Sequence, residues 1–60
     1  MYETSIQAGK KYKMFSGLKI VALESKTAEA GFIECRVLED KGDYKKDSIQ
    51  ELNIEFMVSV

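Results

Sequence analysis

The sequence predicts an all-β domain of about five short antiparallel strands that form a small barrel or a strongly curved sheet. Three observations lead to this prediction. Apolar and polar residues alternate with a period of two in several segments, as expected for strands that bury one face. The four glycines of the chain, in the absence of proline, divide it into segments of strand length. With 60 residues the chain forms one small domain, residues 1–60, and so small a sheet must curl to enclose a core.

The first half of the chain contains three candidate strands. Residues 1–8 and residues 11–15 each alternate apolar and polar side chains, and a turn at Gly9 is predicted between them. Residues 18–25 are apolar on both faces, which is typical of a central strand. Residues 27–30 follow either as one helical turn or as an open loop.

The clearest strand pattern lies in the segment that begins at Gly31. Alternation over residues 32–39 predicts a strand with Ile33, Cys35 and Val37 on its inner face. Because free cysteine is most often buried, we expect Cys35 to be a core residue.

The rest of the chain is expected to return along this strand. Residues 40–42 suit a three-residue hairpin turn, and residues 44–49 are then the return strand. Residues 48–51 match a helix capping box, for which we expect at most one helical turn. Residues 52–60 alternate strictly to the end, which predicts a last strand.

The residue types argue against an enzyme. The chain has no histidine and a single cysteine, so it lacks the usual general base, a disulfide and the ligands of a structural zinc site. The neighbour of Cys35, Arg36, points to the opposite face of the strand and cannot activate the thiol. We therefore expect no catalytic residue, no cofactor and no metal.

The charge distribution is uneven along a nearly neutral chain. Residues 1–30 carry five lysines and three glutamates, a net charge of +2, whereas residues 31–60 carry four basic and seven acidic residues, a net charge of −3. No apolar run approaches the ~20 residues that span a membrane, and no export signal is recognisable. A cytoplasmic location without a membrane partner is the resulting expectation.

Four segments carry a resemblance to a known class of domain. They are GLKIVAL at residues 17–23, the strand at 32–38, GDY at 42–44 and IQEL at 49–52. Their spacing resembles that of SH3-like small β-barrels of the KOW and Tudor kind. The resemblance implies a five-stranded barrel that acts as a binding module. The paired aromatics of a proline-peptide groove and the aromatic cage of a methyl-lysine reader are not recognisable.

A protein partner or a second copy of the chain is the first predicted ligand. The apolar end of the last strand can offer an open edge for pairing, and an exposed apolar patch usually marks an interface. The alternative is that this strand closes the sheet within one molecule. The residues expected to form the patch are Tyr2, Ile6, Met57, Val58 and Val60.

A nucleic acid is the alternative ligand. Basic residues interleaved with an aromatic ring can contact phosphates while the ring stacks on a base. The residues that would form such a face are Lys10, Lys11, Lys13, Phe15 and Lys19. The competing interpretation is a solvated strand whose other face, Tyr12 and Met14, belongs to the core. From the sequence alone, the net charge of −1 and the acidic second half favour protein binding.

Overall fold

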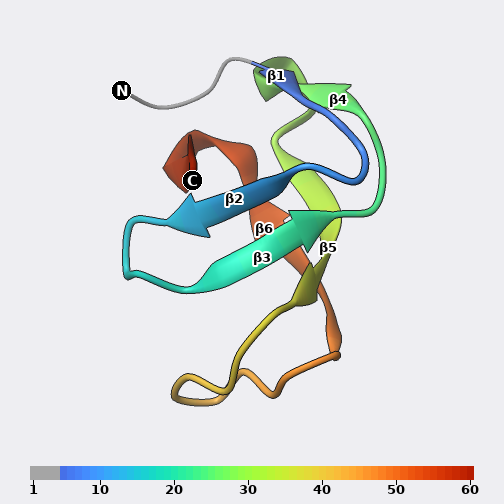
Figure 1. The fold of residues 1–60 in the computed structure, drawn as a ribbon. Helices are drawn as coiled ribbons and strands as arrows, with labels where there is room; N and C mark the ends of the chain where they lie inside the picture. The colour runs from blue at the N-terminus through green and yellow to red at the C-terminus, as the bar shows by residue number, and fades with distance from the viewer. Residues whose placement is uncertain (1–4) are drawn as a thin grey trace.

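The structure is a computed structural model that describes residues 5–60, and it is all-β apart from two 3₁₀ turns in this part of the chain (Figure 1). The strands are β1 (Ser5–Ile6), β2 (Lys11–Met14), β3 (Lys19–Ala22), β4 (Lys26–Thr27), β5 (Phe32–Val37), β6 (Ile49–Asn53) and β7 (Met57–Ser59). The 3₁₀ turns are η1 (Ala28–Ala30) and η2 (Ile54–Phe56). The predicted fold class is confirmed.

The strands form two antiparallel sheets. The larger sheet has five strands in the order β6-β5-β3-β2-β7, and β1 pairs with β4 in a small second sheet. The edge strands of the larger sheet, β6 and β7, do not pair with each other. The larger sheet is therefore a curved sheet and not a closed barrel. Figure 1 shows β2 and β3 side by side, with β5 and β6 turned steeply across them.

The inner face of the larger sheet supplies most of the core. Alternation along β2, β3 and β5 sends every second side chain inward, and the predicted core residues of β5 are fully buried. The phenol oxygen of buried Tyr12 accepts a hydrogen bond from the backbone N–H of Gln7 at 3.0 Å, so its polar atom is satisfied. The buried set is Ile6, Tyr12, Met14, Leu18, Ile20, Ala22, Ile33, Cys35, Val37, Leu52, Ile54 and Met57.

The prediction of a short hairpin after β5 is wrong. The strand that returns along β5 is β6, which begins at Ile49, and residues 38–48 form a long connection that extends away from β1 and β4 in Figure 1. Residues 44–48 cannot continue a strand because Asp47 has a positive φ of 69°. The turn itself is tighter than predicted, since Lys41 and Tyr44 exchange both backbone hydrogen bonds at 2.9 Å.

The prediction of one continuous last strand is also wrong. The turn η2 separates β6 from β7, and the expected helical turn therefore lies at Ile54–Phe56 rather than at residues 48–51. The predicted alternation matches the observed burial as far as Ile54. The next buried residue is Met57, three positions later, and not Phe56. Three residues are one turn of a 3₁₀ helix.

Two alternatives in the first half are settled by the structure. Residues 28–30 form the 3₁₀ turn η1 rather than an open loop. The strand predicted over residues 18–25 is the central strand β3, although it ends at Ala22. No helix within residues 5–60 is long and apolar enough to cross a membrane.

Candidate functional site

The outer face of the five-stranded sheet carries a group of cationic side chains. Because Tyr12 and Met14 are buried, the residues that alternate with them in β2 point to the outer face. The exposed cations of this face are Lys11 and Lys13 on β2, Lys19 on β3 and Arg36 on β5. We call these four residues the basic end.

Strand register orders the basic end into rows across the sheet. Lys13 lies directly opposite Lys19 on β3 and directly opposite Val58 on β7. In the next row, Val21 lies between Lys11 on β2 and Arg36 on β5. Half-buried valines thus separate the charges and give the surface an apolar component.

The basic end is electrostatically unfavourable for the isolated domain. Side chains directly opposite each other in an antiparallel pair lie about 5 Å apart at Cβ, and like charges at that distance repel. The Lys13–Lys19 pair has this arrangement. The one ion pair among residues 5–60 joins Lys26 to Glu24 at 3.4 Å, so no carboxylate of the described chain neutralises the basic end.

An exposed aromatic pair adjoins the basic end. The β2–β7 ladder continues past Met14 and Met57, and the backbone N–H of Phe15 donates to the carbonyl of Phe56 at 3.0 Å. Phe15 and Phe56 therefore share the outer face with Lys13, one row away. Their ring centroids are 5.3 Å apart with an interplanar angle of 52°. The side chains remain 70% and 41% exposed, so they are not core residues.

Short-range contacts hold this aromatic pair in place. The side-chain oxygen of Asn53 caps η2 by accepting the N–H of Glu55 at 2.9 Å, and Phe56 ends that turn. After Phe15 the chain reverses at Gly17, which has a φ of 95°. A Cβ on Gly17 would lie 3.8 Å from the Nζ atom of Lys41, so a further ammonium from residues 38–48 lies beside this turn.

The other end of the same face is acidic. Glu34 on β5 lies directly opposite Glu51 on β6, and Phe32 lies opposite Asn53 in the next row. Phe32 is 50% exposed and has no ring partner among the described residues. We call Glu34, Glu51 and Phe32 the acidic end.

The Lys13–Lys19 row and the acidic end are far enough apart to act separately, whereas Arg36 lies two residues from Glu34 on the same face of β5. The backbone N–H of Leu38 bonds the carbonyl of Lys19, so position 38 marks the Lys13–Lys19 row on β5, and Glu34 lies four residues earlier. Four strand residues span about 13 Å. This exceeds the Debye length of about 8 Å at physiological ionic strength, so the acidic end does little to cancel the field of the Lys13–Lys19 row.

The residues predicted to bind nucleic acid mostly converge on this face. Lys11, Lys13, Lys19 and Phe15 all lie there, as the alternation predicts. Lys10 precedes β2, and its Nζ atom lies 5.6 Å from the centroid of the buried Tyr12 ring, an arrangement suited to a cation–π contact. Whether these residues bind a ligand stays a prediction.

The residues predicted to bind a protein partner are dispersed. Met57 and Ile6 are buried in the core, so their side chains do not contribute to an exposed patch. Val58 lies on the outer face beside Lys13, and Val60 is 73% exposed beyond the end of β7. Tyr2 lies outside the described residues.

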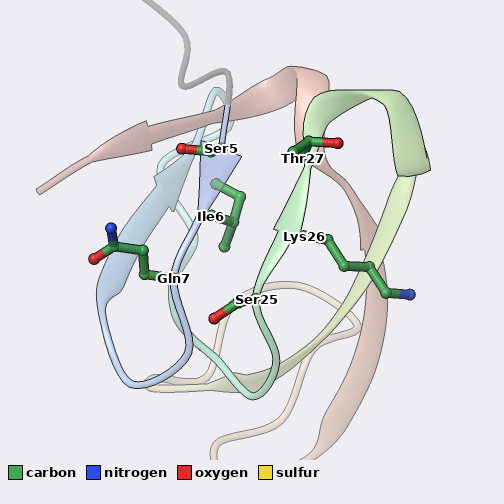
Figure 2. Close-up of a pocket in the computed structure, with 6 residues that line it drawn as sticks. All are labelled: Ser5, Ile6, Gln7, Ser25, Lys26 and Thr27. Atoms are coloured by element: carbon green, nitrogen blue, oxygen red, sulfur yellow. The ribbon is translucent and has the colours of Figure 1, made fainter.

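A surface depression lies elsewhere, between β1 and β4. Figure 2 shows that Ile6 points between these two strands, whereas Gln7 and Lys26 project away. The depression is open and apolar at its base, and Lys26 is already paired with Glu24. Five of its six lining residues are polar, and the hydroxyl oxygen of Ser25 already accepts the backbone N–H of Ala8 at 2.9 Å. Its lining residues are Ser5, Ile6, Gln7, Ser25, Lys26 and Thr27.

Cys35 and Glu24 have shifted pKa values. Burial raises the pKa of the Cys35 thiol to about 11, and the charge of Glu24 adds to this effect, so the thiol stays protonated at neutral pH. The pKa of Glu24 is lowered, mainly because its carboxylate accepts the backbone N–H of Glu34 at 3.1 Å. No group of three metal-ligating side chains occurs in residues 5–60.

Comparison of the chain with protein-family models, with curated proteins and with solved structures finds no match. The interpretation of the site therefore depends on its own geometry. Sequence reasoning missed Arg36 and Phe56, because each joins the outer face through pairing with a strand distant in sequence. It missed Lys41 because residues 38–48 were expected to form a short hairpin.

Proposed function

We propose that the chain is a non-enzymatic nucleic-acid-binding module and that the basic end of its outer face contacts the phosphate backbone. The observation that carries the proposal is the placement of four exposed cations in two adjacent rows, next to the aromatic pair. Like-charge pairs that lower the stability of the free domain are relieved when phosphates lie between them.

The net charge of −1, which in the sequence favours a protein partner, is a weaker objection once the charges have positions. Local potential rather than net charge attracts a polyanion, and the acidic end lies beyond the screening distance of the Lys13–Lys19 row. Four phosphate contacts support only modest affinity, and that affinity comes mainly from counterion release. We therefore expect weak binding at physiological salt and clear binding at low salt.

The strand connectivity supports assignment to the SH3-like class, which we include in the proposal. The strands β2, β3, β5 and β6 form a meander, and η2 then leads into β7, which returns to pair with β2. This order, with one 3₁₀ turn before the last strand, is compatible with the small β fold that the sequence resembles. The resemblance of the sequence to the KOW and Tudor kind agrees with a binding role for an exposed sheet face.

The proposal is tested by the salt dependence of oligonucleotide binding. Fluorescence anisotropy of a labelled single-stranded oligonucleotide is measured as protein is added at several salt concentrations. If all four cations of the basic end contact phosphates, the logarithm of the association constant falls with the logarithm of salt with a slope of about −3. No binding at low salt, or a slope near zero, would contradict the proposal.

A protein partner is the second candidate, and the edge position of β7 favours it. This strand pairs with β2 on one side and has no strand neighbour on the other among the described residues. An unpaired edge is a template for strand addition by another chain, including a second copy of this one. Sedimentation equilibrium separates the two candidates. The nucleic-acid proposal predicts a monomer that forms a complex with the oligonucleotide, whereas a dimer in its absence would favour the second candidate.

A further inference from the structure

We infer that the aromatic pair, Phe15 and Phe56, is a base-stacking platform and that the ligand is a single strand with accessible bases. This inference rests on the proposed function and names the class of nucleic acid that the same face takes. It starts from an arrangement that packing alone does not require, because both rings remain exposed while the core beneath them is fully buried.

The geometry of the pair assigns different roles to the two rings. At an interplanar angle of 52°, a flat base can lie parallel to one ring only. Phe15 is the more exposed of the two, so it is the ring that the base covers. Phe56 packs against Phe15 at a centroid distance of 5.3 Å and restricts its orientation before the ligand binds. A ring held in advance loses less conformational freedom on binding.

The neighbours of the pair determine which ligand fits. Lys13 precedes Phe15 by two residues on the same face, which is about 7 Å along the strand. Lys41 lies beside the turn at Gly17, two residues after Phe15. A ring with cations nearby suits a chain in which phosphates and flat bases alternate. A duplex offers the phosphates but keeps its bases stacked and paired, so it cannot use the ring.

The third exposed phenylalanine provides an internal control. Phe32 is 50% exposed on the same outer face, but it lies beside Glu34 and Glu51. If exposed rings were only incidental apolar surface, Phe32 and Phe15 would be equivalent. We expect them to differ, because the basic end attracts a polyanion toward Phe15 and the acidic end repels it from Phe32.

The test compares three probes that share a phosphate backbone. They are a labelled oligothymidylate of about 12 nucleotides, an abasic oligomer of the same length, and a duplex. The length lies within the site sizes of small single-strand-binding domains. The chain is expected to bind the oligothymidylate about 5- to 100-fold more tightly than the abasic oligomer. This is the gain in affinity expected when one base stacks on an aromatic ring. Phe15→Leu should remove this difference and leave the affinity for the abasic oligomer unchanged.

Phe32→Leu is the matched control and should change neither affinity. Circular dichroism melting of both variants checks the fold, which exposed Phe-to-Leu changes should preserve. Equal affinity for the oligothymidylate and the abasic oligomer would overturn the stacking inference and leave the proposed function standing. Preference for the duplex would likewise overturn the inference. No binding of any probe at low salt would overturn the proposed function as well.

Discussion

The basic and acidic ends of the outer face are built by the same sheet in opposite ways. Each has a pair of like charges directly across two strands, Lys13–Lys19 at one end and Glu34–Glu51 at the other. Each also has exposed aromatic surface next to the charges. Exchanging one member between the pairs would create two attractive pairs instead of two repulsive ones. The sequence thus forgoes local stability at both ends and keeps the face electrostatically divided.

This division teaches that the net charge of a small domain can conceal its binding surface. Under the proposed function, the basic end attracts an anionic chain, and the acidic end limits how far along the face that chain extends. Proteins that break a local stability rule often do so at functional positions. Substitutions in the inner layer that both ends share should affect the whole sheet, whereas a substitution at one end should affect that end alone.

The largest expected effect comes from the shared inner layer. Val37 is fully buried on β5 opposite Ile20, and truncating it removes packing from the inner layer of the sheet that carries both ends. Val37→Ala should lower the free energy of unfolding by ~1–3 kcal/mol, the usual range for a buried truncation. Chemical denaturation measures this change. Oligonucleotide affinity, measured well below the melting temperature, should be unaltered, and an unchanged melting temperature would show that Val37 does not support the sheet.

A smaller effect should appear when the repulsion at the basic end is removed. Lys19→Glu gives Lys13 an opposite charge across the strands, which should raise the free energy of unfolding by about 0.2–1 kcal/mol. The same change should weaken oligonucleotide binding about ten-fold at low salt, because it removes one phosphate contact and adds repulsion. Stability and affinity therefore move in opposite directions.

Lys46→Glu is the matched control for this experiment. Lys46 is exposed in the connection between β5 and β6, and its substitution changes the net charge by the same amount. We expect less than about a three-fold change in affinity, because this position lies outside the basic end. Equal losses for Lys19→Glu and Lys46→Glu would mean that net charge, rather than the outer face, governs binding.

The smallest effect is expected at the acidic end. Glu51→Lys replaces the Glu34–Glu51 repulsion with an attractive pair and should stabilise the domain by about 0.2–1 kcal/mol. Unlike Lys19→Glu, it should leave oligonucleotide affinity unchanged or raise it slightly, by less than about three-fold. A loss of affinity would place Glu51 within the binding site and remove the distinction between the ends.

How much of this architecture the sequence predicts depends on the range of the interactions involved. The inner and outer residues of β5 follow from alternation, since Ile33, Cys35 and Val37 need only their own strand to define a face. The partner of β5 does not follow, because its register is set by the distant pairing of Ile33 with Leu52. Nothing in residues 44–49 alone shows that Asp47 interrupts the predicted strand.

The same distinction between local and distant interactions applies to the candidate site. Alternation in β2 correctly places Lys11, Lys13 and Phe15 on one face. The second ring, Phe56, joins them only because η2 shifts the chain so that Met57 pairs with Met14. A period of two continues through η2 by coincidence, so the pattern conceals the turn. Pairing between distant strands, which alternation does not encode, completes the site.

The most direct test of the basic end as a nucleic-acid surface is a two-dimensional ¹H–¹⁵N NMR titration of the chain with the oligothymidylate. The account predicts that the largest shifts occur at residues of the outer face around Lys13, Lys19, Phe15 and Phe56, with little change at Glu34 and Glu51. Shifts centred on the acidic end or on residues 38–48 away from Lys41, or no shifts at low salt, would contradict it.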